Sequence, residues 1–152
     1  MLDVNYCLVE YCNIIGVRTI SKITYKVNMK ITVEELSHVF KSSGIKRPSD
    51  DFNRLQRMIE NSNVLITAWD NDLLIGVARA ITDYSYSCYL SDLAVDNEYQ
   101  NKGIGKNLVQ LVQEDIGEEV ALILLSSPIA MEFYPTIGFE KIENGFKISR
   151  KK

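Results

Sequence analysis

The sequence has few of the residues from which disulfide-bonded, zinc-binding or membrane-spanning proteins are built. It contains three cysteines, an odd number without a CxxC spacing, and one histidine, His38. We therefore expect no disulfide framework, no three-His catalytic zinc site and a reducing, cytoplasmic location. The longest apolar run, Val120 to Leu125, is far shorter than the ~20 residues of a membrane helix. The N-terminus also lacks the basic lead-in of a signal peptide.

An excess of charge of one sign is missing as well. Lys and Arg number 17 against 20 Asp and Glu, and the formal net charge is −3. Nucleic-acid binding needs a basic surface, so we expect no nucleic-acid partner, and the short apolar runs predict no membrane partner. Hydrophobic residues make up 46% of the 152-residue chain, which is enough for one domain with its own core.

Hydrophobic periodicity and turn signals predict an α/β fold with a mixed sheet. Thr32 and Glu35 form a capping box at the start of a helix that Gly44 ends. Asn144-Gly145 is typical of a two-residue hairpin turn. The expected order is strand 23–28, helix 32–43, a helix after Ser49, strands 64–69, 73–81 and 85–95, helix 104–116, strand 120–125, helix 130–134, and a terminal hairpin of strands 139–142 and 146–149.

The ends of this pattern set the expected domain boundaries. Residues 1–21 show no clear element and are assigned to an N-terminal extension of uncertain structure, and residues 22–152 form the domain. The strand 120–125 is apolar throughout, so we expect other elements to cover both of its faces. For the second helix we expect two carboxylates in the first turn, Asp50 and Asp51, and a buried face of Phe52, Leu55 and Ile59.

The segment most informative about chemistry joins the strand 85–95 to the helix 104–116. A polar loop follows Leu93-Ala94-Val95, and Gly103 and Gly105 open the helix. Glycines allow a close approach to the backbone, and the first N–H groups of a helix have no partner within it. With the helix dipole they form an anion site, to which Lys102 or Lys106 adds charge.

Two familiar phosphate motifs do not fit this loop. A P-loop requires Gly-Lys-Ser/Thr after four intervening residues, and Gly105-Lys106-Asn107 fails in spacing and at its third position. A dinucleotide fingerprint requires a third glycine, where this chain has Leu108. The loop also follows a run of expected hairpins rather than the first strand of a parallel unit.

Two motifs together resemble the GNAT family of N-acetyltransferases. Gln100-x-x-Gly103-x-Gly105 is similar to the acetyl-CoA loop of that family, and Phe133-Tyr134-Pro135-Thr136-Ile137-Gly138-Phe139 is similar to its C-terminal signature. The expected order of elements is also similar, over about residues 22 to 150. The resemblance implies that the chain transfers the acetyl group of acetyl-CoA to a primary amine, and that it needs no metal.

The resemblance also implies roles for individual residues. The strand before the loop splays from its parallel neighbour, and its free backbone pairs with the pantetheine arm of the coenzyme. Tyr134 lies near the coenzyme sulfur and donates a proton to the leaving thiolate. The residues expected at the coenzyme are Leu93, Ala94, Val95, Gln100, Asn101, Lys102, Gly103, Ile104, Gly105, Lys106, Ser127 and Phe133.

The identity of the general base is open at this stage. The attacking amine must lose a proton, which a nearby carboxylate can accept. Asp92, next to Leu93, is the first candidate; Asp83 is the second, and Glu34 or Glu35 the third. The alternative for Asp92 is a structural carboxylate bonded to the backbone.

Two further questions also stay open. A catalytically silent module that senses acetyl-CoA or CoA is the alternative to an enzyme. The acceptor amine has no decisive code, because Tyr84, Tyr86 and Tyr89 fit a strand as well as an acceptor pocket. We expect a homodimer, by analogy with small acetyltransferases of this family.

Overall fold

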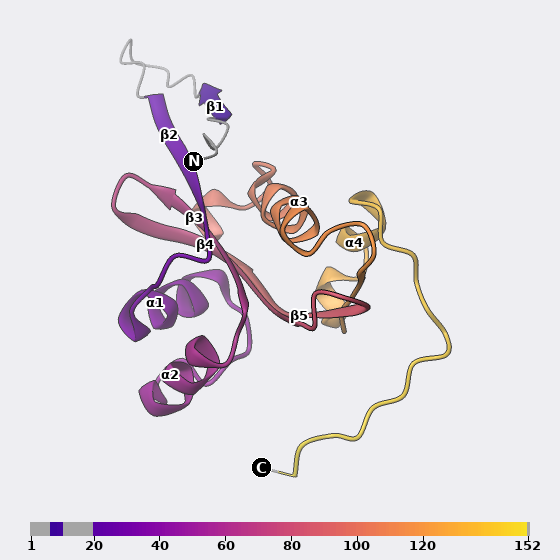
Figure 1. The fold of residues 1–152 in the computed structure, drawn as a ribbon. Helices are drawn as coiled ribbons and strands as arrows, with labels where there is room; N and C mark the ends of the chain where they lie inside the picture. Colours follow the sequence, from indigo (N-terminus) through magenta and orange to yellow (C-terminus); the bar gives the residue numbers. More distant parts are fainter. Residues whose placement is uncertain (1–6, 11–19, 152) are drawn as a thin grey trace.

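The computed structural model describes residues 7–10 and 20–151, and one mixed sheet organises them (Figure 1). Its six strands lie in chain order. All neighbouring pairs are antiparallel except the last, which is parallel. The strands are β1 (Cys7–Glu10), β2 (Ile20–Val27), β3 (Val64–Asp70), β4 (Leu73–Thr82), β5 (Ser87–Val95) and β6 (Ala121–Ile123).

Helices cover both faces of this sheet. α1 (Val33–Ser43) and α2 (Phe52–Glu60) pack on one face, over a cluster that includes Phe40 and Trp69. α3 (Ile104–Ile116) packs on the other face, over a cluster that includes Leu108 and Ile66. The short helices η1 (Asn97–Tyr99), η2 (Pro128–Ala130) and α4 (Phe133–Thr136) lie in the connections. The predicted α/β fold is confirmed.

Short-range signals account for the ends of α1, and a glycine in β4 accounts for the close packing of α3 on the sheet. The Thr32 side chain accepts from the Glu35 N–H while the Glu35 carboxylate accepts from the Thr32 N–H, and Gly44 ends the helix with a φ of 76°. Both features match the predicted capping box and stop. Gly76 leaves room for α3, because a Cβ there would lie 3.1 Å from Leu108 Cδ1.

The predicted terminal hairpin is wrong. Residues 139–151, all described by the structure, form no strand: Phe139 packs against the core and the rest continues as an extended segment (Figure 1). Phe146 and Ile148 are fully exposed. A two-stranded hairpin is marginal by itself, so the Asn144-Gly145 turn signal does not suffice without a neighbouring strand.

The prediction for strand 120–125 is wrong in its burial. β6 spans only Ala121–Ile123, and Ile123 and Leu125 are exposed. β6 is the edge strand of the described sheet and pairs with β5 alone. The second helix also differs: Asp51 is its N-cap rather than a first-turn residue, and Phe52 is 43% exposed, although Leu55 is fully buried as expected.

Candidate functional site

The site begins where β5 and β6 separate. The two strands pair in parallel over only three residue pairs, from Ser87–Ala121 to Tyr89–Ile123, whereas β5 continues to Val95. The far end of β5 therefore has a ladder partner on the β4 side alone. Leu93, Ala94 and Val95 lie in this splayed part, as the resemblance implied, and a ligand that forms strand-like hydrogen bonds fits there.

Gln100 holds the loop after β5 in place. Its side-chain amide donates to the Val95 carbonyl oxygen at 2.8 Å and to the Asn97 side-chain oxygen at 3.0 Å. The loop then turns through two left-handed residues, Asn101 with a φ of 61° and Gly103 with a φ of 80°. Gln100 therefore shapes the loop from within through its side-chain amide.

The first turn of α3 presents backbone donors to this loop. In the described part of the chain, no side chain caps the helix at Gly103, and the first helical bond is that from the Asn107 N–H to the Gly103 carbonyl. The N–H groups of residues 104–106 thus lack helical acceptors. Lys106 is exposed beside them, whereas the Lys102 ammonium donates to the Glu98 carbonyl oxygen at 2.7 Å. This geometry suits a pyrophosphate.

Phe133 closes the same corner from the other side. A Cβ at Gly105 would lie 3.3 Å from Phe133 Cζ and 3.9 Å from Val95 Cγ2. The absence of a side chain at Gly105 therefore lets Phe133 approach the α3 terminus and the end of β5. The structure thus places Gly105 in a corner where a side chain at this position would touch both Phe133 and Val95.

Tyr134 is fixed by aromatic packing in α4. Its ring meets those of Phe133 and Phe139 edge to face, with centroids 5.3 and 5.5 Å away. Among the described residues no group hydrogen-bonds its hydroxyl, which leaves the proton available. Burial raises the pKa of Tyr134, and the nearby positive charge of Arg47 opposes that rise. The hydroxyl is therefore protonated at neutral pH, as a proton donor must be.

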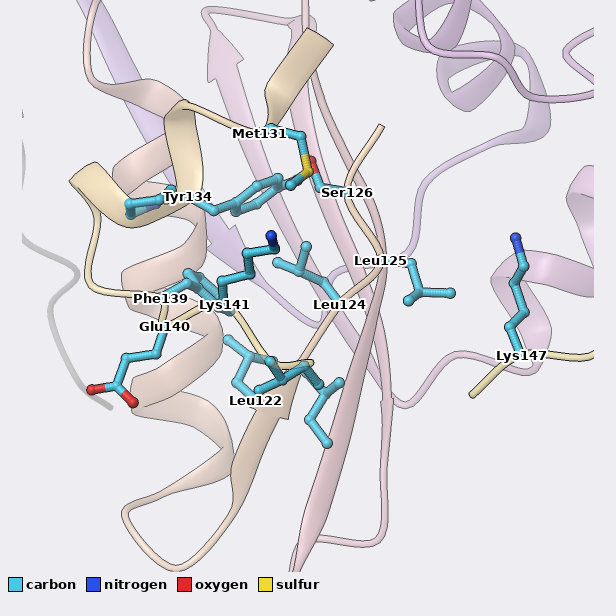
Figure 2. Close-up of a pocket in the computed structure, with 13 residues that line it drawn as sticks. Leu122, Leu124, Leu125, Ser126, Met131, Tyr134, Phe139, Glu140, Lys141 and Lys147 are labelled. Atoms are coloured by element: carbon cyan, nitrogen blue, oxygen red, sulfur yellow. The ribbon is translucent and has the colours of Figure 1, made fainter. Parts of the chain in front are cut away.

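A cavity of about 440 Å³ adjoins the Tyr134 ring between the β6 segment and α4 (Figure 2). Leu122 and Leu124 face it from one side and Met131 and Phe139 from the other. The remaining lining residues are Ile123, Leu125, Ser126, Tyr134, Pro135, Glu140, Lys141, Ile142 and Lys147. Ser127, expected at the coenzyme, is exposed at the N-cap of η2 and does not line this cavity.

Asp92 is not placed as a general base requires. Its side chain has no exposed surface, and both carboxylate oxygens accept from guanidinium groups, one from Arg47 Nε and the other from Arg79 Nε at 2.5 Å. A base must reach the acceptor nitrogen with a free lone pair. The geometry therefore favours the alternative, a structural carboxylate, although the partners are arginines rather than the backbone.

The other candidate bases are also engaged. The Asp83 carboxylate accepts from the N–H groups of Ser85, Tyr86 and Ser87, and the backbone hydrogen bonds lower the pKa of Asp83. Asp83 lies in the turn before β5, about 26 Å along the strand from the acetyl-CoA loop. Glu35 belongs to the capping box of α1, and Glu34 beside it is exposed.

Sequence reasoning did not find the two arginines. Arg79 is the single charged residue of an otherwise apolar strand, 73–81, and an isolated charge in such a pattern indicates a buried partner. That signal was available. Arg47 gave no such signal in the sequence, because a basic residue in a polar loop is common. Its position beside Tyr134 is decided by the fold.

Tyr99 lies in η1, directly before the loop that begins at Gln100, and its hydrogen bond to Asp70 predicts a pH-dependent change in stability. Its hydroxyl donates to the Asp70 carboxylate at 2.7 Å, and this bond is the main cause that raises the pKa of Tyr99 to about 12. A raised tyrosine pKa contributes stability that is complete below pH ~10 and is lost as pH rises toward ~12. We expect the unfolding temperature to fall less steeply between those pH values in Tyr99→Phe than in wild type. Equal slopes in a thermal unfolding series would contradict the assignment.

Two features are absent from the described residues: a cluster of metal-ligating side chains and a helix that could span a membrane. Within residues 7–10 and 20–151 there is no group of three His, Cys, Asp or Glu side chains that could hold a metal ion. None of the helices in this part of the chain is long and apolar enough to cross a membrane.

Comparison with known proteins identifies the family. The sequence pattern of an acetyltransferase (GNAT) domain matches residues 35–148. The uncharacterized N-acetyltransferase ycf52 of Pyropia yezoensis is 30% identical over 142 residues, which cover 86% of this chain and 80% of that protein. GCN5-related N-acetyltransferase 2, a chloroplastic protein of Arabidopsis thaliana, is 39% identical over 79 residues. The match covers 49% of this chain and 30% of that longer protein.

Solved structures share the fold. A probable acetyltransferase of Staphylococcus aureus superposes with a TM-score of 0.69 at 24% identity, over 84% of this chain and all of that one. An aminoglycoside N-acetyltransferase in complex with CoA superposes with a TM-score of 0.65 at 17% identity, over 86% of this chain and 95% of that one. Because the matched domain covers residues 35–148, this chain belongs to the GNAT family of acetyltransferases.

Proposed function

We propose that this chain transfers the acetyl group of acetyl-CoA to a primary amine. The observation that carries the proposal is the meeting of three elements at one corner: the free end of β5, the uncapped start of α3, and α4, whose Phe133 lies against Gly105 and precedes Tyr134. A relative in fold was solved with CoA bound, which supports acetyl-CoA as the co-substrate. The α3 terminus would hold the pyrophosphate, and the end of β5 would pair with the pantetheine arm.

In the proposed reaction the neutral amine attacks the thioester carbonyl. A C–N bond forms, and the carbonyl becomes a tetrahedral oxyanion that backbone N–H groups of the splayed β5 stabilise. When the C–S bond breaks, CoA leaves as a thiolate, and Tyr134 donates its proton to the sulfur. We propose that the ammonium formed by attack loses its proton to water, since Asp92, Asp83 and Glu35 are hydrogen-bonded within the protein and Glu34 is exposed to solvent.

The direct test is release of free CoA thiol from acetyl-CoA with a panel of amines, and mass spectrometry of the products. The panel should hold amino acids, polyamines, aminoglycosides, arylalkylamines and peptides, because the site does not choose among them. Turnover with one class supports the enzyme and names the acceptor. Binding of CoA without turnover of any amine would instead support the sensor module.

We also propose that the protein is a homodimer in a reducing, cytoplasm-like compartment. Large apolar side chains are exposed at Tyr86, Phe146 and Ile148, and a second copy would cover such surface. Cys88 is a free, buried thiol, in keeping with a reducing environment. Light scattering is expected to give twice the chain mass at micromolar concentration, and a particle of 17.3 kDa would contradict the dimer.

A further inference from the structure

β5 contains a bulge at Ser91, in the part of the strand that no longer pairs with β6. Leu90 and Leu93 are three residues apart, yet both pack into the cluster beneath α3, whereas a regular strand would place them on opposite faces. The register with β4 shifts between Leu90 and Asp92, so Ser91 has no partner in the ladder. The bulge thereby turns Asp92 toward the face covered by α1 and α2.

Two guanidinium groups hold the unpaired residue. Arg47 Nη2 donates to the Ser91 carbonyl oxygen at 2.8 Å, and Arg79 Nη2 donates to the Ser91 hydroxyl at 2.7 Å. The Nε atoms of the same two arginines bind the two oxygens of Asp92. Each arginine therefore forms a fork across Ser91 and Asp92, and the polar groups of the bulge gain the partners that the ladder does not supply.

The two arginines come from different elements on the face of the sheet that α1 and α2 cover. Arg47 lies in the α1–α2 loop, where the following Pro48 restricts its backbone to extended conformations. The same loop is tied to α1 by the hydrogen bond from the Ser37 hydroxyl to the Ser49 carbonyl at 2.8 Å. Arg79 comes from β4, and its Nη1 donates to the Ser62 hydroxyl at 3.0 Å, just after α2.

The burial of these charges shows that they are not a surface ion pair. The side chains of Asp92 and Arg79 are 0% and 7% exposed, and that of Arg47 is 28% exposed. Desolvation offsets much of the attraction in a buried ion pair, so such a cluster is a poor way to gain stability alone. What it does provide is a fixed direction, because a planar guanidinium with two acceptors has one geometry.

We propose that Arg47, Arg79 and Asp92 are positioning residues: they clamp the β5 bulge at Ser91 and so set where the splayed backbone meets the acetyl group. Arg47 connects the α1–α2 loop to that backbone. The proposal rests on the proposed acetyl transfer, since the clamp acts through β5. It assigns to Asp92 a role in geometry instead of proton transfer.

Arg47→Gln tests the clamp, since Arg47 is at its exposed edge and its loss leaves Asp92 paired with Arg79. Arg57→Gln, an exposed arginine on α2, is the matched control. We expect Arg47→Gln to lower kcat about tenfold, with KM for acetyl-CoA and for the acceptor within about threefold of wild type. Arg47→Lys should not restore kcat, because an ammonium cannot form the fork.

Three kinetic results would overturn the clamp. A rise in the acceptor KM at unchanged kcat would make Arg47 a substrate contact. Full recovery of kcat in Arg47→Lys would show that Arg47 contributes only its charge. A wild-type kcat in both Arg47→Gln and Arg47→Lys would show that Arg47 has no role in catalysis. Asp92→Asn, where it folds, is expected to keep the acidic limb of the pH–rate profile; loss of that limb would make Asp92 the base.

Hydrogen exchange separates failure of the clamp from failure of the proposed function. In Arg47→Gln we expect faster amide exchange in residues 44–51 and 87–95 and unchanged exchange in 104–116, with Arg57→Gln like wild type. This measurement needs no turnover. If no amine is acetylated by wild type, acetyl transfer fails while the clamp is still decided; unchanged exchange in 87–95 would refute the clamp itself.

Discussion

Replacing Tyr134 with phenylalanine is expected to lower kcat by about 10²-fold and to leave CoA affinity within about threefold. The change removes one hydroxyl and keeps the ring that packs against Phe133 and Phe139. A positioned acid contributes on the order of 10²-fold or more, and a 10²-fold loss corresponds to roughly 2.7 kcal/mol of transition-state free energy. The measurement is kcat and KM for acetyl-CoA in the thiol-release assay, beside the unfolding temperature.

The control is Tyr86→Phe, which removes the same hydroxyl from a residue that is 79% exposed. It should match wild type in every parameter. A Tyr134→Phe enzyme that turns over within about threefold of wild type, or ~0.65 kcal/mol, would show that water or another group protonates the thiolate. Tyr134 would then be a core aromatic beside the coenzyme.

Replacing Gly103 with valine is expected to weaken CoA binding by at least tenfold, or about 1.4 kcal/mol. Gly103 has a φ of 80°, where a β-branched residue is strained, and it precedes the free N–H groups of α3. A side chain there occupies space that the pyrophosphate needs. Gly105→Val should weaken binding as well, because its Cβ would press on Phe133 at 3.3 Å. Calorimetry with CoA measures both affinities.

Gly117→Val distinguishes backbone strain from loss of the ligand site. Gly117 ends the same helix with a φ of 83° and a ψ of 171°, a region that only glycine adopts readily. Its substitution should lower stability at least as much as Gly103→Val, yet leave CoA affinity unchanged. Folded Gly103→Val and Gly105→Val proteins that bind CoA as wild type does would remove the pyrophosphate from this loop.

The same glycines illustrate what the sequence alone can determine. The capping box of α1, the stop at Gly44 and the start of α3 at Gly103 each depend on residues within four positions of one another. Interactions of that range are present in the sequence itself, so they could be predicted. The loop between β5 and α3 could be predicted for the same reason, since the strand end and the helix start are adjacent in the chain.

Features that depend on distant residues were predicted poorly. Asp92 was expected to act as a base because its neighbours in sequence are coenzyme residues. The bulge at Ser91 turns it to the other face, and two arginines, 45 and 13 residues away, take both oxygens. A one-residue shift in register reverses every side chain beyond it, and no local pattern reveals such a shift.

The C-terminal segment also shows that a local signal is not enough when long-range contacts are missing. Asn144-Gly145 is a strong local turn signal, yet residues 139–151 lie along no strand of the described sheet. Turn propensity contributes little until each strand gains a neighbour that buries its apolar face. The sequence by itself thus determined the order of elements from β2 to α4 and the glycine start of α3, because these depend on short-range contacts. Only the tertiary structure decided the facing of β5, the partners of Asp92 and the burial of the last strand, because long-range packing sets these.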